Sequence, residues 1–300
     1  MDKNMRILIT GGTGLVGTVL TKLLIDKGHE VAHLSRSKAD GLIKTFTWDI
    51  TKRQIDQEGI EWADAIIHLA GAGVAEKRWS VDRKAEILHS RTHSTQLLRE
   101  AIDRATNRPT IFVSASAIGI YGADTGTSLL DESAPAGSDF LAQVVQAWEH
   151  EVTQIETLGL RTVMVRIGIV LAKEGGALPQ MLQPPVAAPL GSGDQYMSWI
   201  HIQDLAELFL FALTHEISGA FNAVAPHPET NRDLTQKAAK AKGKFFLGIS
   251  VPGFLLKLIL GEMAQIVLGG SKLSAQKITA AGFQFKYPRV EDALRDIFSK

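Results

Sequence analysis

The chain has 300 residues, 45% of them hydrophobic, which is enough for one large domain or for a domain with a smaller appendage. Its 32 Lys and Arg residues balance 32 Asp and Glu residues, so the net charge gives no long-range attraction to nucleic acid or to a membrane. The sequence contains no cysteine, which excludes disulfides, thiolate metal sites and a Cys nucleophile. We therefore expect a cytoplasmic protein without a metal, a nucleic-acid partner or a membrane partner.

The most apolar stretches of the chain are not expected to cross a membrane. Residues 175–193 contain four prolines, and residues 251–270 are interrupted by Lys257 and Glu262. The first apolar run, residues 7–10, is short and stops at two glycines, so it predicts a strand rather than a signal peptide or an anchor.

Short apolar runs alternate with helical patterns through the first two thirds of the chain. Amphipathic helices are expected over 15–28 and along 81–105. Strands are expected at 5–10, 30–35, 65–69, 110–116 and 161–168. This alternation predicts an α/β fold, in which helices cover both faces of a doubly wound parallel sheet.

The pattern changes after about residue 168, where a loop rich in glycine and proline begins. A helix is expected at 203–215, a strand near Phe221 and a last helix at 290–298. We expect a larger domain of residues 1–168 plus about 197–225. Residues 169–196 plus 226–300 are expected to form a smaller cap domain that holds the substrate.

A glycine-rich loop follows the first expected strand and opens the first helix. Its glycines allow a tight turn, close approach of a pyrophosphate to the backbone, and close packing of helix against sheet. The strand, spacing and helix together favour a dinucleotide site over a turn without a ligand. The predicted contacts are Gly11, Gly12, Thr13, Gly14, Leu15, Val16 and Gly17.

The end of the second expected strand indicates which dinucleotide binds. A carboxylate there would accept a hydrogen bond from the 2′-hydroxyl of NAD, but no carboxylate lies between Glu30 and Asp40. Ser35 and Arg36 stand there instead, and a guanidinium can pair with the 2′-phosphate of NADP. We therefore predict NADP(H), and the alternative is a solvated basic loop.

Several motifs together resemble the extended short-chain dehydrogenase/reductases of the NAD-dependent epimerase/dehydratase family. Further motifs make the chain similar to the YfcH-type epimerase-family proteins, which carry a C-terminal domain of unknown function. This resemblance covers the chain essentially end to end and implies a Rossmann-type fold that binds NADP(H). The motifs include His68-Leu69-Ala70-Gly71, Lys77-Arg78-Trp79, Ser114-x-Ser116, Val165-Arg166-x-Gly168, Ser198-Trp199-Ile200-His201 and Ala280-Ala281-Gly282-Phe283.

The resemblance also implies cofactor contacts outside the glycine loop. Leu69 and Ala70 would pass adenine and ribose, and Ile169 would lie beside the nicotinamide. Arg91 would face phosphate or ribose oxygens, and Glu86 would orient either a ribose hydroxyl or Arg91. The alternative for Glu86 and Arg91 is a solvated pair on one helix.

The usual catalytic pair of the wider superfamily is missing. Hydride-transferring members use Tyr-x-x-x-Lys, but none of the three tyrosines here has a Lys four residues later. Anchored on Glu149, the pattern places Leu141 at the Tyr position and Val145 at the Lys position. Neither side chain can move a proton.

A proton donor must therefore lie elsewhere if the protein turns over a substrate. We expect Ser116 or Tyr121 first, since both should lie at the carboxyl end of the strand expected at 110–116, and His201 next. Each also has a structural alternative as an ordinary hydrogen-bonding residue. Weaker candidates are Ser114, Asp131 and Glu132.

Two classes of function remain open. The first is an NADP(H)-dependent oxidoreductase or sugar-nucleotide epimerase-like enzyme, whose unassigned small-molecule substrate would be a nucleotide sugar or a carbonyl compound. The second is a non-catalytic NADP(H)-binding sensor or partner-binding module. By analogy with extended relatives, a homodimer would form through the helices at about 81–106 and 139–158.

Overall fold

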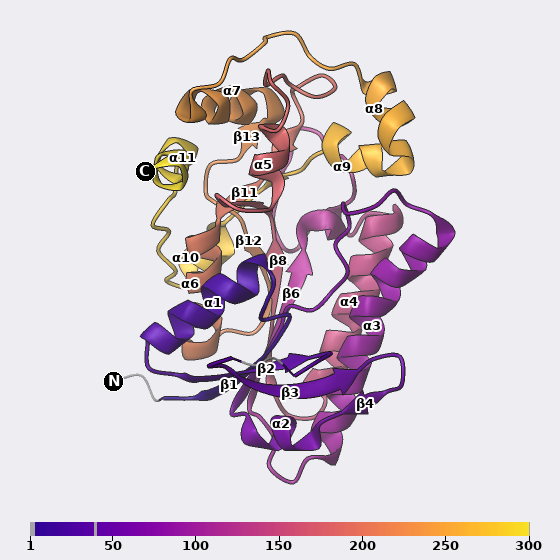
Figure 1. Cartoon of the computed structure of the whole chain (residues 1–300), viewed down its shortest axis with the longest axis vertical. Helices are drawn as coiled ribbons and strands as arrows, with labels where there is room; N and C mark the ends of the chain where they lie inside the picture. Colours follow the sequence, from indigo (N-terminus) through magenta and orange to yellow (C-terminus); the bar gives the residue numbers. More distant parts are fainter. Residues whose placement is uncertain (1–3, 39–40, 300) are drawn as a thin grey trace.

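A parallel sheet of eight strands organises the chain, and the computed structural model describes residues 4–38 and 41–299 (Figure 1). The strand order is β12-β8-β6-β5-β1-β2-β3-β4, and every neighbouring pair is parallel except β3 and β4. The strands are β1 (Arg6–Thr10), β2 (Glu30–Ser35), β3 (Lys44–Asp49), β4 (Gln54–Ile55), β5 (Ala65–His68), β6 (Ile111–Ala117), β8 (Arg161–Ile167) and β12 (Gly219–Ala223).

Helices cover both faces of this sheet, as the sequence predicts for a doubly wound fold. Helices α1 (Leu15–Asp26) and α6 (Ile202–Thr214) pack together on one face, and α3 (Val81–Arg104) and α4 (Phe140–Glu156) pack on the other (Figure 1). Short α2 (Gln57–Trp62) lies near the β4 end. The chain reverses its direction of winding between β1 and β5, which is where such folds bind ligands.

Polar caps explain where the two long helices of the second face begin. The Ser80 hydroxyl accepts a hydrogen bond from the backbone N–H of Arg83 at the start of α3. The Asp139 carboxylate accepts from the N–H of Ala142 at the start of α4. Such caps satisfy N–H groups that have no partner inside the helix.

The remaining elements lie mostly beyond the carboxyl end of the sheet (Figure 1). They form small two-stranded pairs, β9 with β11, β10 with β13 and β7 with β14, and several short helices. They are η1 (Ile118–Tyr121), β7 (Leu129–Leu130), β9 (Ile169–Leu171), α5 (Ala177–Met181), β10 (Tyr196–Met197), β11 (Trp199–His201), β13 (Glu229–Thr230), α7 (Asn231–Lys242), α8 (Gly253–Leu260), η2 (Gly261–Ala264), α9 (Gln265–Leu268), β14 (Lys272–Leu273), α10 (Gln276–Ala280) and α11 (Val290–Phe298).

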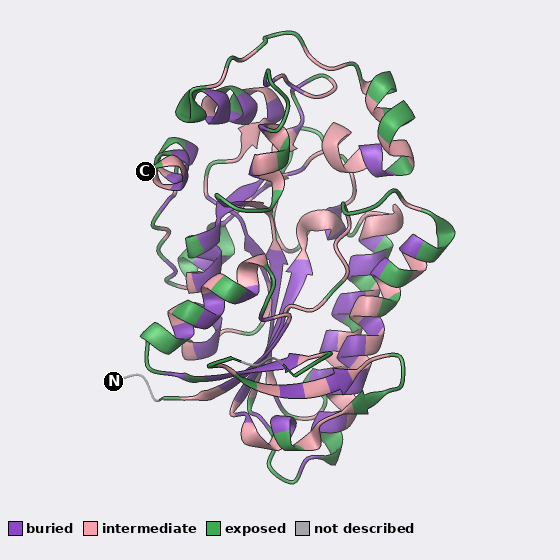
Figure 2. Ribbon diagram, viewed as in Figure 1, coloured by how far each residue is buried: buried purple, intermediate pink, exposed green. Residues whose placement is uncertain are grey.

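Two apolar cores hold the molecule together, and the buried residues follow the sheet and the inner sides of its helices (Figure 2). The second core includes Trp199, Leu234 and Leu294. Leu273 and Phe283, which lie within the predicted cap segment, pack in the first core. The proposed domain boundaries remain a prediction.

Within residues 4–38 and 41–299, no helix has the length and apolar character needed to cross a membrane.

Candidate functional site

Two glycines of the loop after β1 are required by the fold itself. Gly11 has φ +69°, and a Cβ there would lie 3.0 Å from the backbone carbon of Leu69. A Cβ at Gly17 would lie 2.3 Å from the Gly11 carbonyl oxygen. These contacts place the loop, α1 and the chain after β5 too close together for side chains.

Gly14 differs from these two because the protein leaves space around it. Its backbone is extended, with φ −75° and ψ 175°, and a Cβ there would meet only the Gly11 carbonyl oxygen, at 3.3 Å. Gly14 precedes α1 without a side-chain cap, and the first turn of α1 carries no acidic residue. The free N–H groups of that turn therefore suit an anion such as a pyrophosphate.

The other predicted contacts of the loop surround this open position. Thr13 is exposed, and Leu15 and Val16 are half-buried. A Cβ at Gly12 would lie 2.4 Å from the imidazole of His33, so that glycine serves packing.

A buried hydroxyl fixes the glycine loop against the chain that follows β5. The Thr10 Oγ1 accepts the backbone N–H groups of Leu69 and Ala70, both at 3.1 Å, and lies 2.7 Å from Nδ1 of His68. The Nε2 of His68 lies 3.1 Å from the Ser94 hydroxyl, which itself donates to backbone carbonyls. Burial and then the charge of Arg91 lower the pKa of His68 to about 3, so the ring is neutral.

Ser35 and Arg36 stand at the carboxyl end of β2, as predicted. Ser35 is half-buried, and Arg36 is exposed. In the described ranges Arg36 makes no hydrogen bond or ion pair with another side chain, and Asp40 lies outside the described residues. The guanidinium is therefore available to a phosphate, and the alternative of a solvated loop stays open.

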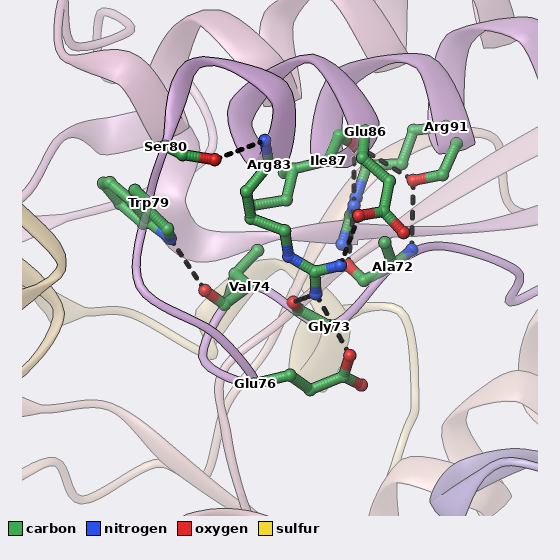
Figure 3. Close-up of polar contacts among 11 residues, drawn as sticks. Ala72, Gly73, Val74, Glu76, Trp79, Ser80, Arg83, Glu86, Ile87 and Arg91 are labelled. Atoms are coloured by element: carbon green, nitrogen blue, oxygen red, sulfur yellow. Dashed lines mark hydrogen bonds and ion pairs between the residues drawn. The ribbon is translucent and has the colours of Figure 1, made fainter.

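Arg91 is a half-buried cation on α3, beside the loop of residues 71–80 (Figure 3). It donates to the carbonyls of Ala72 at 3.0 Å and Ile87 at 2.9 Å, and its guanidinium lies over the ring of Trp148. No carboxylate of the described residues pairs with it. Burial and then the charge of Arg83 lower its pKa to about 10, so a nearby anion would favour its charged form.

In the described residues Glu86 has no hydrogen bond or ion pair with Arg91, which corrects one of the two roles expected for it. Its carboxylate accepts from Nη1 of Arg83 at 2.6 Å, and Nη2 of Arg83 donates to Glu76 at 3.0 Å and to the Gly73 carbonyl (Figure 3). Arg83 was not predicted as a site residue, although its i,i+3 spacing from Glu86 is a usable signal. A contact of Glu86 with a ribose hydroxyl stays a prediction.

Hydrocarbon side chains stand at the two positions of α4 that the sequence predicts to replace the usual catalytic pair. Val145 is buried and Leu141 is half-buried, and both face η1. A Cβ at Gly119 of η1 would lie 3.5 Å from Cβ of Leu141 and 3.9 Å from Cγ2 of Val145. This contact is apolar and holds no group that transfers protons.

A buried polar network lies beside this position, between the sheet and α4. Ser116, Arg166 and Asn222 are direct neighbours on β6, β8 and β12. The Arg166 guanidinium binds Glu149 of α4 through two hydrogen bonds of 2.8 Å, and the Ser116 hydroxyl donates to the same carboxylate at 2.6 Å. Burial opposes the charge of Arg166, but Glu149 and then Tyr121 outweigh it and raise its pKa.

Tyr121, which lies in η1, is the last member of this polar network. Its hydroxyl donates to Oδ1 of Asn222 at 2.7 Å and accepts from Nη1 of Arg166 at 2.9 Å. Burial raises its pKa, so the phenol stays protonated near neutral pH. The structure thus brings Ser116 and Tyr121 together, and both hydroxyls donate to partners inside the protein.

His201 lies in a different environment, at the start of α6. Its Nδ1 accepts from the N–H of Gln203 at 3.1 Å, which caps the helix. Its ring lies 4.0 Å from the ring of Tyr287, and Nε2 lies 3.4 Å from Asp296. Burial lowers its pKa to about 4. No hydrogen bond found in the described residues joins it to the network of Ser116 and Tyr121.

Ile169 opens β9, just past the carboxyl end of β8. Its N–H donates to the Ser198 carbonyl at 2.8 Å, and it pairs with Trp199 of β11. A Cβ at Gly168 would lie 2.5 Å from that same carbonyl oxygen. The chain therefore turns sharply from the sheet into the region expected to hold the nicotinamide.

Family models match most of the chain. The model described as NAD dependent epimerase/dehydratase family matches residues 7–223, and a domain of unknown function, DUF1731, matches residues 251–297. Both matches confirm the resemblance to the epimerase/dehydratase family and the expected C-terminal domain of unknown function, and the narrower YfcH-type assignment stays a prediction.

Named relatives and solved structures agree with these models. An epimerase family protein SDR39U1 homolog, chloroplastic, from Arabidopsis thaliana is 36% identical, over 99% of this chain and 87% of that protein. The crystal structure of the human epimerase family protein SDR39U1 with NADPH has a TM-score of 0.87 at 34% identity, covering 98% of this chain and 99% of that chain. A nucleoside-diphosphate sugar epimerase from Corynebacterium glutamicum has a TM-score of 0.80 at 30% identity, covering 99% of this chain and 58% of that one. The chain therefore belongs to the NAD dependent epimerase/dehydratase family.

Proposed function

We propose that this chain is an NADP(H)-dependent oxidoreductase or epimerase-like enzyme that acts on a small carbonyl compound or a nucleotide sugar. The observation that carries the proposal is the open position at Gly14, where the first turn of α1 presents N–H groups to space that no side chain fills. NADP(H), when bound, supplies a hydride that the amino acids themselves cannot carry.

The residues around this position suit NADP(H) in three places. The turn at Gly14 would bind the pyrophosphate, and exposed Arg36 would bind the 2′-phosphate. Arg91, a half-buried cation with no carboxylate partner in the described residues, would gain a counter-charge from a phosphate. The presence of NADPH in the similar human SDR39U1 structure supports the same choice.

A second candidate function is an NADP(H)-binding module that catalyses nothing fast. Leu141 and Val145 at the catalytic positions favour it, because they leave hydrocarbon where the superfamily has its acid and base. The hydroxyls of Ser116 and Tyr121 both donate hydrogen bonds inside the protein, which also favours the binding module.

Arg36→Asp should remove or invert the preference for NADPH. For the wild type we expect NADPH to bind at least about tenfold more tightly than NADH, a difference of about 1.4 kcal/mol. Aspartate would repel the 2′-phosphate and accept a hydrogen bond from the 2′-hydroxyl of NADH. Calorimetric titration of both proteins with both nucleotides measures the change, and equal wild-type affinities would contradict the assignment of Arg36.

Oxidation of NADPH against a panel of carbonyl compounds and nucleotide sugars distinguishes the two candidate functions. If a compound is turned over, Leu141→Ala should change the rate no more than the loss of packing at that position would. Removing a true proton donor would instead lower the rate by about 10²–10⁴-fold. Ser116→Ala, Tyr121→Phe and His201→Ala then test the predicted donors. Full activity in all three would exclude these residues, and no turnover of any compound would favour the binding module.

A further inference from the structure

Large apolar side chains are exposed together at one end of the molecule. Twelve such side chains are well exposed in the described parts of the chain, and seven of them lie within residues 245–259, so the clustering is not a scatter of single residues. We call these seven the α8 surface: Phe245, Leu247, Ile249, Phe254, Leu255, Leu258 and Ile259.

The exposure is built into the fold rather than due to a loose segment. Backbone hydrogen bonds hold residues 245–251 against residues 187–191, for example from Leu247 N to the Ala187 carbonyl at 2.8 Å. Helix α8 follows directly and has no buried residue. Phe254 is 69% exposed and Leu258 is 75% exposed. A helix this apolar is normally buried in protein or in lipid.

The charges around the α8 surface indicate the kind of partner. Residues 234–261 contain five lysines and no aspartate or glutamate. Lys240, Lys242 and Lys257 are exposed and form no ion pair with any carboxylate in the described ranges. A second copy of the chain would bring the same lysines face to face, which is unfavourable. An anionic lipid bilayer offers both an apolar interior and negative headgroups.

The position of the surface also suits a flat partner. The link after α7 and helix α8 lie at one end of the long axis, and α2 and β4 lie at the other end (Figure 1). Figure 2 shows exposed and intermediate residues, and none that is buried, along the link after α7 and along α8. A bilayer can therefore meet this end without contact with the sheet or with the glycine loop.

We propose that the α8 surface docks this protein on the surface of an anionic lipid bilayer. The apolar side chains enter the boundary between headgroups and acyl chains, and the lysines face the headgroups. The balanced net charge of the whole chain predicts no long-range attraction to membranes. The exposed apolar side chains and lysines of this one end would instead bind the bilayer once the two surfaces touch. The proposal is independent of what the chain binds at Gly14.

Flotation of the full chain with lipid vesicles tests this proposal. We expect binding to vesicles of phosphatidylcholine with phosphatidylglycerol, weaker binding to phosphatidylcholine alone, and weaker binding at high salt. The double variant Phe254→Ser/Leu258→Ser should reduce binding by roughly tenfold or more. Lys257→Glu should reduce it by about fivefold or more.

Matched controls separate this effect from misfolding and from self-association. Leu42→Ser removes a fully exposed leucine outside the α8 surface and should leave vesicle binding unchanged. The double variant should keep the wild-type circular dichroism. Absence of wild-type binding to anionic vesicles overturns the proposal. A wild-type dimer that the double variant dissociates, without any vesicle binding, would assign the surface to a second copy instead.

Discussion

Replacing Gly14 with valine is expected to abolish NADPH binding while the protein remains folded. The backbone at Gly14 is extended, and a Cβ there would meet only one protein atom within 4 Å, the Gly11 carbonyl oxygen at 3.3 Å. The branched side chain would instead fill the space where a pyrophosphate approaches the N–H groups of α1. We expect affinity to fall by roughly a hundredfold or more, about 2.8 kcal/mol, in a calorimetric titration.

Two other glycines serve as controls for this experiment. A Cβ at Gly248 would have no neighbour within 4 Å, so Gly248→Val should bind NADPH like the wild type. Gly17→Val should instead damage the fold, since its Cβ would lie 2.3 Å from the Gly11 carbonyl oxygen. If Gly14→Val keeps both its circular dichroism and its NADPH affinity, the loop is a turn without a ligand.

Glu149→Gln is expected to lower the free energy of unfolding by about 3–5 kcal/mol, the usual effect of breaking a buried ion pair. Arg166 is 8% exposed and would keep its charge without the carboxylate it now binds twice. The glutamine amide would keep only one acceptor oxygen in place of the two carboxylate oxygens that now accept from Ser116 and Arg166. Urea unfolding followed by circular dichroism measures the loss.

A surface pair provides the comparison for this variant. Glu100 pairs with Arg53, and both side chains are more than a third exposed, so Glu100→Gln should change stability by less than about 1 kcal/mol. The double variant Glu149→Leu/Arg166→Met should lose less than the sum of the two single variants, because it leaves no uncompensated charge. Additive losses would show that Glu149 and Arg166 do not act as a pair.

Much of the fold could be predicted because the central strands are buried on both faces. Strands β1, β2, β5, β6 and β8 appear in the sequence as short apolar runs, and the structure confirms them. Strand β3 was not predicted, because it alternates buried and half-buried residues near the edge of the sheet. The small strands outside the main sheet have two or three residues, too few for a periodic pattern.

The glycine loop of the proposed cofactor site was more predictable than the polar network beside it. The glycine loop is contiguous in sequence, and its spacing carries a physical reason at each glycine. The network instead joins residues that are far apart in the chain. The register of β6, β8 and β12 aligns Ser116, Arg166 and Asn222, and the packing of α4 on the sheet adds Glu149. Ser116 and Tyr121 were expected near one another, but their internal hydrogen bonds could not be read from the sequence.

The structure of this protein with NADPH bound is the most direct test of the proposed cofactor site. We predict the pyrophosphate against the first turn of α1 above Gly14, and the 2′-phosphate in hydrogen-bond contact with Arg36. Arg91 should lie on the same side of the loop of residues 71–80 as the bound nucleotide. A nucleotide whose pyrophosphate lies away from Gly14, or whose 2′-phosphate does not contact Arg36, would contradict this account.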